Sequence, residues 1–502
     1  MKATKRILLG LAAVGALSGA ASDGHALVFT RHPWLSLQTT TSMLVAWQTD
    51  AASSSVVHYG PDPVLDWSSA SQASQPGLVV DHAVPLSGLA PGTRYRYRVV
   101  SGTDTLDAGS FRTAPDAPES FRFLAFGDIG TATAPQRAIA ARADSLNADL
   151  AILTGDIIYD SGEPWNFTPY YFDIYRPTLK RIPFYPVLGN HDTYYNGGAS
   201  FVSAFHLPAN FAAGPERSYS FEYGSAHFAA IEVTVENTAP SAAAMAWLDA
   251  DLAATTKPWK FVFFHVPMYS NGGGHGGDAA IAAALEPIIL ARGVDMVFQG
   301  HNHFYTRTYP IHSGQAVDQT WEPAYFNPSG PIYVVAGGGG RNLYALTAQT
   351  PLEVLSRSVY HLVSVDVWGD SLTLRAIQQD GTVFDTMTVR KGTPTHAEDP
   401  PAEETSESAP LRFALGHPRP NPSGGNADIR FTLPAAGRAS IRVLDARGRR
   451  VRAEELGTVE RGHHVWRWDG RDDRGRAVAT GRYFLELRAG PNRARAALTL
   501  LR

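Results

Sequence analysis

The pattern of apolar and polar positions divides the chain into three regions. In the first, from about residue 28 to 114, short runs rich in β-branched and aromatic residues alternate with turn residues, as in 42–47 and 55–59. Runs of this length bounded by turns are typical of an all-β module. The pattern therefore predicts an N-terminal β-sandwich.

In the second region, from about residue 120 to 390, the pattern changes to strand, loop and helix. Short, largely apolar runs suit strands covered on both faces, and longer segments between them have helical periodicity. The predicted strands are 121–126, 150–154, 182–188, 260–264, 294–299 and 332–336, and the predicted helices are 135–147, 242–254 and 278–292. This alternation predicts a central α/β domain.

The third region begins after a stretch, 391–411, that is rich in Pro, Glu, Ser and Thr. Such a composition predicts a disordered linker. Residues 412–502 then contain 19 arginines, no lysine and 9 acidic residues, a net charge of +10, whereas the whole chain carries −4. Strand-like runs recur in this segment, so we expect a second β-sandwich with a strongly basic surface.

Composition fits this multidomain organisation. A chain of 502 residues exceeds the roughly 250–300 residues at which single cores stop growing. It contains no cysteine, which excludes disulfides and thiolate metal sites. Residues 1–26 have a basic start (Lys2, Lys5, Arg6) and an apolar run from Ile7 to Ala20. This run is too short to span a membrane, so we expect a cleaved signal peptide, export to the cell surface or medium, and no transmembrane segment in the mature chain.

Polar motifs follow several predicted strands at their carboxyl ends. The candidate side chains in these motifs are Asp128, Asp156, Tyr159, Asn190, His265, His301 and His303. The carboxyl ends of strands in an α/β sheet open onto one crevice, so these side chains are expected to meet there. Two carboxylates, a phenol, an amide oxygen and three imidazoles can together hold two metal ions, one harder than the other.

These motifs resemble those of the purple acid phosphatases, a branch of the calcineurin-like metallophosphoesterases. Most members of the wider group have Asp-x-His at the first motif, whereas here Gly130 occupies the histidine's place and Tyr159 offers a replacement ligand. The resemblance implies an α/β/β/α sandwich over 119–390. Residues 27–115 resemble the fibronectin type III-like domain that plant-like members also carry, because 88–99 is similar to a tyrosine corner.

The resemblance also implies roles for the candidate ligands. Asp156 bridges the two metal ions. Asp128, Tyr159 and His303 complete a site for Fe(III), and Asn190, His265 and His301 complete a site for a divalent ion, which could be Zn, Fe(II) or Mn. The expected reaction is attack of a metal-bound hydroxide on a phosphate monoester, and the harder ion predicts activity at acidic pH.

Two further histidines are candidates for substrate binding and acid catalysis. His191 directly follows Asn190, and Asp192 is a candidate to orient it. His275 lies in a glycine-rich loop, so the alternative for this residue is an exposed loop histidine. By resemblance, both imidazoles bind phosphate and protonate the leaving alcohol.

Other conspicuous residues favour structural roles. His227 and His361 sit within strand-like runs, and packing is the favoured role for Tyr305 and Arg307. The four glycines 337–340 lack the Gly-Lys-Ser/Thr ending of a phosphate loop. We therefore expect this segment to pass close beneath the site rather than to bind phosphate.

Two other functions stay open. A phosphodiesterase acting on cyclic nucleotides or other diesters could use the same metal core, and the chain could be a surface adhesion or sorting protein with a vestigial phosphoesterase. Residues 466–472 and 481–483 resemble the immunoglobulin-like module of flagellar hook-capping proteins, which is similar to C-terminal sorting domains of type IX-like secretion. This module could contact secretion machinery or anionic envelope polymers. Specific nucleic-acid binding is disfavoured because aromatic stacking platforms are missing.

Overall fold

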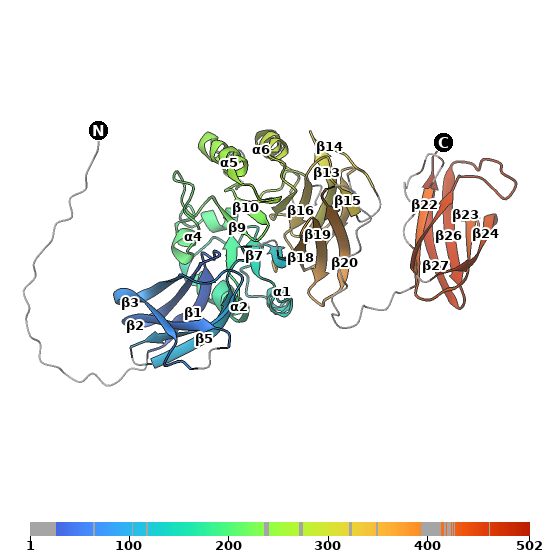
Figure 1. Ribbon diagram of the computed structural model, residues 1–502. Helices are drawn as coiled ribbons and strands as arrows, with labels where there is room; N and C mark the ends of the chain where they lie inside the picture. Colours follow the sequence, from blue (N-terminus) through green and yellow to red (C-terminus); the bar gives the residue numbers. More distant parts are fainter. Residues whose placement is uncertain are drawn as a thin grey trace, which may run out of the picture. The chain divides into compact units, whose positions relative to one another are not determined.

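The computed structural model describes residues 27–63, 66–102, 104–116, 119–234, 240–270, 275–320, 324–347, 350–392, 413–415, 418, 423, 425, 427–460 and 462–501. The expected signal peptide, 1–26, lies outside the described residues, as does nearly all of the expected linker. The chain divides into two compact units, Met1–Pro394 and Thr395–Arg502, which are described separately below (Figure 1).

The first unit begins with a strand-rich domain. Its strands are β1 (Phe29–Ser36), β2 (Ser42–Pro61), β3 (Ser71–Ser87), β4 (Arg94–Ser101) and β5 (Asp104–Arg112), paired in the order β1-β2-β4-β5 with β3 on β2. The two apolar runs predicted in 42–59 belong to the single long strand β2. The Tyr95 hydroxyl accepts a hydrogen bond from the Ala90 amide (2.9 Å), as the tyrosine-corner pattern predicts.

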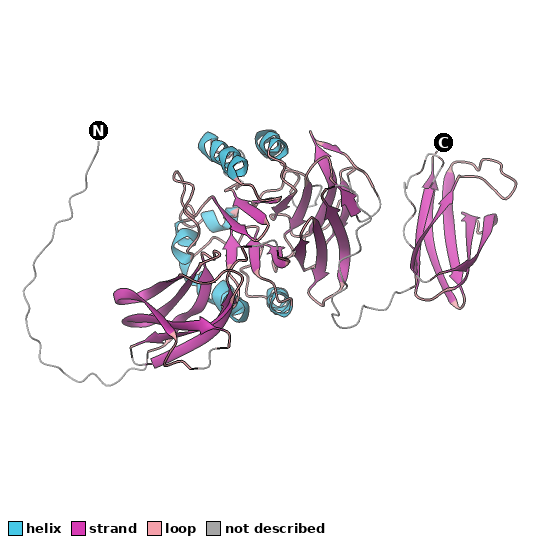
Figure 2. Cartoon of the chain, viewed as in Figure 1, coloured by secondary structure: helices cyan, strands magenta, loops and turns pink. Residues whose placement is uncertain are grey.

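Two sheets form the centre of the first unit (Figure 2). One has the order β14-β13-β16-β12-β11-β10-β9, with β17 paired to β13, and the other has the order β15-β20-β19-β18-β6-β7-β8. The strands are β6 (Phe121–Phe126), β7 (Leu150–Leu153), β8 (Phe184–Pro186), β9 (Tyr219–Tyr223), β10 (Ala226–Ala230), β11 (Trp259–Phe263), β12 (Met296–Gln299), β13 (Tyr305–His312), β14 (Gln315–Ala316), β15 (Ala324–Phe326), β16 (Ile332–Ala336), β17 (Glu353–Arg357), β18 (His361–Trp368), β19 (Ser371–Gln378) and β20 (Val383–Arg390).

Helices cover the outer faces of these sheets. They are α1 (Ala134–Ser145), the short helices η1 (Pro164–Asn166) and η2 (Thr168–Phe172), α2 (Asp173–Leu179), α3 (Asn190–Thr193), α4 (Ala199–Ala204), α5 (Ala242–Ala254) and α6 (Ala279–Ala291). Leu248 of α5 and Leu285 of α6 pack with Val262 and Val297 on one sheet in a single apolar cluster. The predicted helices 135–147, 242–254 and 278–292 correspond to α1, α5 and α6, and each is confirmed within two residues at both ends.

The two sheets pack face to face through aromatic side chains. The Phe123 ring lies 5.2 Å from Phe228, 5.1 Å from Phe261 and 5.7 Å from Phe298, measured between centroids. Strands buried on both faces must be apolar along their whole length, which explains the uninterrupted apolar runs in this region. The result is the layered α/β/β/α arrangement that the resemblance implied.

The second unit contains two small sheets. They comprise β21 (Ala414–Leu415), β22 (Ala427–Leu433) and β25 (Gly462–Trp468), and β24 (Arg450–Val459), β23 (Gly437–Asp445), β26 (Gly481–Ala489) and β27 (Asn492–Leu500). Ile429, Trp468 and Leu485 are fully buried between them. The predicted C-terminal β-sandwich is confirmed. Among the residues that the structure describes, none of the helices has both the length and the apolar character to cross a membrane.

Candidate metal centre

The predicted ligands meet where the carboxyl ends of strands from both sheets converge. Asp128 follows β6, Asp156 and Tyr159 follow β7, and Asn190 begins the helix after β8. These belong to one sheet, while His265 follows β11 and His301 follows β12 of the other. All of these side chains and His303 are buried. The site therefore depends on the packing of two sheets rather than on one sheet alone.

Three of the candidate ligands have left-handed backbone conformations. The φ angles are 56° at Asp128, 52° at Asp156 and 65° at His301, a region that residues other than glycine rarely adopt and that is common at functional sites. Amides from other loops hold the carboxylates. The His301 amide donates to both oxygens of Asp128 (3.1 and 3.0 Å), and the His191 amide donates to Oδ1 of Asp156 (2.9 Å).

One group of ligands surrounds the Tyr159 hydroxyl. This oxygen lies 2.7 Å from Oδ2 of Asp156, 3.2 Å from Oδ1 of Asp128 and 3.1 Å from Nε2 of His303. Burial raises the pKa of Tyr159 well above its usual value, and the charges of Asp156 and Asp128 raise it further. The phenol can therefore ionise here only when a cation compensates its charge.

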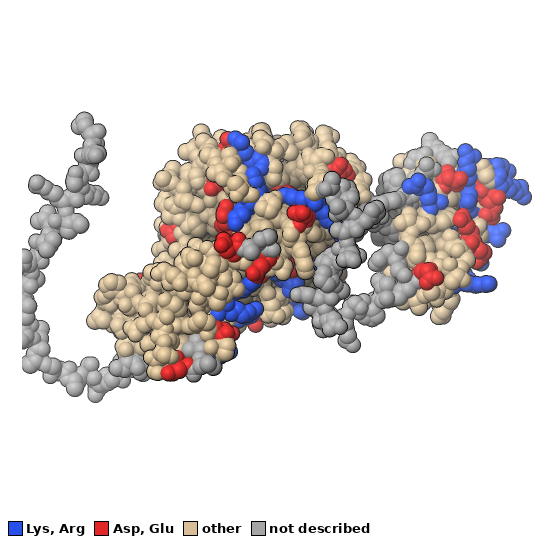
Figure 3. Space-filling model, viewed as in Figure 1, with Lys and Arg blue, Asp and Glu red and all other residues tan. Residues whose placement is uncertain are grey.

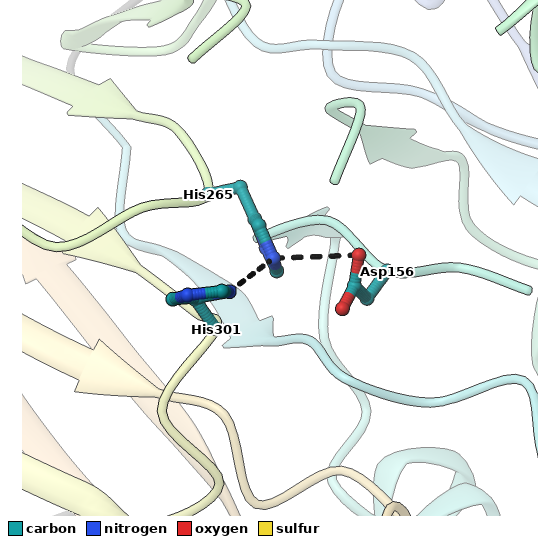
Figure 4. Close-up of side chains that lie close together, drawn as sticks. All are labelled: Asp156, His265 and His301. Atoms are coloured by element: carbon teal, nitrogen blue, oxygen red, sulfur yellow. Dashed lines mark hydrogen bonds and ion pairs between the residues drawn. The ribbon is translucent and has the colours of Figure 1, made fainter. Parts of the chain in front are cut away.

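The second group surrounds the side-chain oxygen of Asn190. Oδ1 of Asn190 lies 3.0 Å from Nε2 of His265 and 3.1 Å from Nδ1 of His301. The two ring nitrogens are 3.2 Å apart, and His265 Nε2 lies 3.3 Å from Oδ1 of Asp156. Figure 4 shows the two imidazoles and the carboxylate turned toward one another.

Backbone carbonyls fix the imidazoles so that lone pairs face the centre. Nδ1 of His265 bonds to the Thr154 carbonyl (2.8 Å) and Nδ1 of His303 to the Asn342 carbonyl (2.7 Å). Carbonyl oxygens only accept, so each Nδ1 carries the hydrogen and each Nε2 presents a lone pair, the arrangement usual for metal-ligating histidines.

Two sets of donor atoms, Asp128/Asp156/His303 and Asp156/His265/His301, each lie within 4.8 Å of one another. Asp156 belongs to both sets. Converging lone pairs of oxygen and nitrogen repel one another unless a cation lies between them. The residues present therefore fit two metal ions that share one carboxylate.

The packing around Gly130 explains why a histidine is missing from the first motif. Gly130 has φ +51°, and a Cβ added there would overlap the Ile157 carbonyl oxygen. The Gly130 carbonyl in turn accepts a hydrogen bond from the Tyr159 amide (3.1 Å). The loop that carries Tyr159 thus occupies the space that a side chain at position 130 would need.

His191 lies beside the cluster, as predicted. Its ring is 4.3 Å from the Tyr159 ring, and its Nε2 is 4.0 Å from Oδ2 of Asp156. Its Nδ1 bonds to the Asp160 carbonyl. The backbone carbonyl of Asp160 therefore orients the imidazole, and the expectation that Asp192 does so is wrong.

Asp192 instead ties two ligand-bearing loops together. Its carboxylate accepts hydrogen bonds from the amides of Ile157 (3.0 Å), Ile158 (2.9 Å) and Gly189 (2.9 Å). Burial, with a further contribution from the charge of Asp156, raises the pKa of Asp192 to about 7. Asp192 is thus a positioning residue for the loops that bear Tyr159 and Asn190.

His275 is exposed but lies against the second ligand group. Its ring centroid is 4.1 Å from that of His301, and its amide donates to Oδ1 of Asn302 (3.1 Å). Burial of part of the ring lowers its pKa, and the charges of His303 and His265 lower it further. The structure thus places His275 within reach of a ligand bound beside His301.

The residues that were expected to have structural roles make contacts that fit such roles. Nε2 of His227 bonds to Asp251 (2.7 Å), Nδ1 of His361 bonds to the Val359 carbonyl (2.9 Å), and Arg307 forms a two-pronged ion pair with Asp385 (2.6 and 2.9 Å). The glycine segment passes directly beneath the site, as predicted. A Cβ on Gly337 would lie 2.7 Å from Oδ2 of Asp128.

Comparison with known protein families agrees with this geometry. Residues 121–305 match the family described as calcineurin-like phosphoesterase, and residues 31–113 match the purple acid phosphatase N-terminal domain. The chain thus combines a calcineurin-like phosphoesterase domain with a purple acid phosphatase N-terminal domain, and its relatives are purple and other acid phosphatases. It is therefore a phosphoester hydrolase. Residues 421–491 match the FlgD Ig-like domain, in agreement with the predicted C-terminal module.

Relatives of this metallophosphoesterase include acid phosphatases from animals and plants. The chain is 25% identical over 333 residues to human acid phosphatase type 7, covering 60% of this chain and 75% of the relative. It is 27% identical over 328 residues to purple acid phosphatase 18 of Arabidopsis thaliana, covering 61% and 70%. The structure of purple acid phosphatase PPD1 from yellow lupin shares the fold, with a TM-score of 0.64 and 20% identity, covering 74% of this chain and 78% of that one.

Two residues of this metallophosphoesterase that face the site were not found from the sequence. The Tyr344 ring stacks on His303 with centroids 4.1 Å apart, and the Arg341 guanidinium lies 4.5 Å from the centre of the Tyr159 ring. Both follow the glycine segment 337–340. The sequence analysis placed that segment beneath the site, so the residues directly after it could have been predicted to face the site as well.

Proposed function

We propose that this chain is a secreted acid phosphatase that hydrolyses phosphate monoesters at a pair of metal ions. The observation that carries the proposal is the position of Asp156. Its Oδ2 lies 2.7 Å from the Tyr159 hydroxyl and its Oδ1 lies 3.3 Å from Nε2 of His265. One carboxylate therefore faces both groups of donor atoms and suits a bridging ligand.

The two groups of donors differ in hardness. Asp128, Asp156, Tyr159 and His303 offer three anionic oxygens and one nitrogen, which suits Fe(III). Asn190, His265 and His301, with Asp156, suit a divalent ion, for which Zn, Fe(II) and Mn are the candidates. A metal pair in these positions would polarise the phosphoryl oxygens and lower the pKa of a coordinated water.

Histidines of the chain itself can then bind the charged phosphoryl group and donate a proton to the leaving alcohol. Nε2 of His191 faces the cluster while its Nδ1 is held by the Asp160 carbonyl. In the imidazolium form this Nε2–H can bind a phosphoryl oxygen or protonate the leaving alcohol. His191 lies beside Tyr159 of the first group of donors, and His275 offers a second imidazole beside His301 of the second group.

Two protonatable rings at the rim of the site favour a monoester over a diester. A monoester phosphate carries up to two negative charges near neutral pH, and a diester carries one, so cationic imidazoles stabilise the monoester more strongly. The names of the relatives, acid phosphatase and purple acid phosphatase, support the same reading.

Export and surface attachment complete the proposal. The basic and apolar segments within residues 1–26 support export. In the C-terminal unit, Arg488, Arg493 and Arg495 donate to Glu486, and Arg442 lies opposite Glu486 in the register of the neighbouring strand. Figure 3 shows arginines gathered on this unit. Three arginines bonded to one carboxylate, with a fourth opposite it on the next strand, leave a positive surface, which suits an anionic envelope polymer.

Surface attachment can be tested with purified cell envelopes. We expect the full chain to sediment with them at low salt and to be released as salt rises, since screening weakens exposed charge pairs. Replacing Arg442, Arg488, Arg493 and Arg495 by glutamine should abolish sedimentation. Binding that is independent of salt and of these arginines would favour the secretion machinery as the partner instead.

The catalytic proposal is tested by metal analysis together with paired substrates. We expect iron and one divalent metal in the purified protein, faster hydrolysis of p-nitrophenyl phosphate than of bis(p-nitrophenyl) phosphate, and an optimum below pH 7. Preference for the bis ester would establish the phosphodiesterase instead. An optimum well above neutrality would favour two divalent ions.

A further inference from the structure

A small hollow of about 180 Å³ opens beside the metal centre, and Tyr159 forms part of its wall. Its walls come from three loops and the short helix η2. They contribute Thr131, Thr133, Tyr159, Asp160, Tyr170, Arg341 and Asn342. The lining is polar, and it shares Tyr159 with the metal centre. A group attached to a phosphate at the metal centre can therefore reach the hollow.

The loops around the hollow are held together by hydrogen bonds. Hydroxyls of Thr133 (3.1 Å) and Thr131 (3.4 Å) donate to the Gly340 carbonyl, and the Arg341 amide donates to the Asp128 carbonyl (3.0 Å). The Asn342 carbonyl accepts from His303. The hollow is thus built on the same backbone that positions two candidate metal ligands, and its shape is fixed with theirs.

Arg341 supplies the positive charge of the hollow. Its guanidinium lies over the Tyr159 ring, and one of its nitrogens, Nη2, lies 2.8 Å from Oδ1 of Asp160. A guanidinium has five N–H donors in a planar fork that matches phosphate and carboxylate oxygens. The ion pair with Asp160 occupies only part of this fork.

Asp160 competes for the same guanidinium. Its side chain is 72% exposed and that of Arg341 is 35% exposed. Exposed ion pairs contribute little stability, so a doubly charged phosphate can replace the carboxylate. The Asp160 side chain and its backbone carbonyl have separate partners, because the carbonyl holds His191. A change of the side chain can therefore leave the His191 contact in place.

We propose that Arg341 forms a second-anion subsite, which selects phosphate monoesters that carry a further phosphate or carboxylate group. Asp160 restrains this selectivity by occupying the guanidinium when the subsite is empty. The inference rests on the proposed phosphomonoesterase and deepens it. The side-chain amide of Asn342, which also lines the hollow, can donate to the oxygens of the second anion.

The test compares fructose 1,6-bisphosphate with fructose 6-phosphate, using initial rates of phosphate release by the metal-loaded full chain. We expect the wild type to prefer the bisphosphate. R341A should lower the ratio of the two kcat/KM values at least about tenfold, mainly by raising KM for the bisphosphate, since the second anion binds equally in ground and transition states. R341K should recover part of the ratio. D160N should raise it, because the competing carboxylate is gone.

Opposite effects of R341A and D160N distinguish the subsite from a purely structural ion pair, whose loss would act in the same direction in both variants. The control is the ion pair between Asp249 of α5 and Arg292, which directly follows α6 and whose side chain is 36% exposed, close to the 35% of Arg341. R292A and D249N should leave the ratio unaltered. The subsite is overturned if R341A lowers kcat/KM for both substrates equally, or if D160N lowers the ratio of the two kcat/KM values.

Failure of the underlying function gives a different result. A metal-loaded wild type that releases no phosphate from p-nitrophenyl phosphate or fructose 6-phosphate overturns the phosphomonoesterase itself. Release from both with an unaltered ratio in R341A overturns only the subsite.

Discussion

Two buried carboxylates, one in each unit, show two ways in which this chain stabilises a charge. Asp156 is 1% exposed and Glu486 is 2% exposed. Burial alone would raise the pKa of both groups. For Asp156 the charge and hydrogen bond of His265 outweigh burial, and for Glu486 hydrogen bonds from Arg493, Arg488 and Arg495 lower the pKa to about 2.

The partners of the two carboxylates differ in kind. Glu486 is surrounded by guanidiniums, which have only donors and carry permanent charge. Asp156 faces a phenol and imidazoles, which carry lone pairs and can change protonation state. The first arrangement is complete without any other group, whereas the second is completed by a metal cation. A buried carboxylate therefore indicates a metal site only when its neighbours are also potential ligands.

Replacing the bridging carboxylate should have the largest effect. We expect Asp156→Asn to lose both metal ions, because the neutral amide supplies neither site with an anionic oxygen. Loss of the several kcal/mol that a metal pair contributes to the transition state corresponds to a fall in kcat/KM on the order of 1000-fold. Metal analysis and p-nitrophenyl phosphate hydrolysis measure the two effects. Full metal content with full activity in this variant would disprove the bridging role.

Replacing Tyr159 should separate the two metal sites. In Tyr159→Phe we expect loss of iron and of the visible band, retention of the divalent ion, and a fall in kcat/KM of roughly 100-fold. His265→Ala is the matched variant on the other side and should lose the divalent ion first. If both variants lose iron and the divalent ion to the same extent, Tyr159 and His265 do not serve separate metal sites.

Adding a histidine in place of Gly130 should not rescue Tyr159→Phe. A side chain at position 130 overlaps the Ile157 carbonyl, so Gly130→His disturbs the loop that carries Tyr159 rather than supplying a ligand. We expect less soluble protein and no gain of iron in the double variant. Recovery of iron would show that the loop can move aside.

The sequence predicted the candidate site better than its surroundings, for physical reasons. Asp128, Asp156, Asn190, His265 and His301 each follow a short apolar run, and strand ends must open onto a crevice. The position of Arg341 depends on a loop whose course is set by hydrogen bonds to Asp128 and by the ion pair with Asp160. Those contacts are far apart in sequence and follow no periodic pattern.

Asp192 illustrates the same limit. Its neighbour in sequence, His191, made it a candidate to orient that ring, but its carboxylate faces three backbone amides instead. The pattern of side chains along a sequence does not show which backbone amides will face a given carboxylate, so these contacts could not be predicted. The fold was more predictable, because burial on both faces of β6, β7, β11 and β12 leaves a continuous apolar signal.

The histidine beside the cluster should have a smaller effect than the ligands. We expect His191→Ala to lower kcat about 100-fold with metal content unaltered, since general acid catalysis contributes about that much. His227→Ala is the control, because His227 pairs with Asp251 away from the site. If metal content falls together with kcat, His191 acts on the ligands rather than on the substrate.

Replacing Glu486 should leave catalysis intact and destabilise only the C-terminal unit. Glu486→Gln leaves Arg488, Arg493 and Arg495 without their shared anion. These arginines are partly exposed, so water offsets much of the loss, and we expect about 1–2 kcal/mol and a shift of several degrees in the melting transition of this unit. Exposed Glu455→Gln is the matched control.

The difference in melting temperature between the wild type and Glu486→Gln should depend on pH, because the pKa of Glu486 is lowered in the folded chain. The value is 4.5 in an ordinary glutamate and about 2 in the folded chain, so the carboxylate stabilises the folded state fully above pH 4.5. This contribution is lost as pH falls through the folded pKa. The melting difference between wild type and Glu486→Gln should therefore be constant from pH 7 to about pH 5 and shrink between about pH 4.5 and 2. A difference that persists at pH 2 would mean that Glu486 acts through packing rather than through its charge, and the contrast with Asp156 would then lose its electrostatic basis.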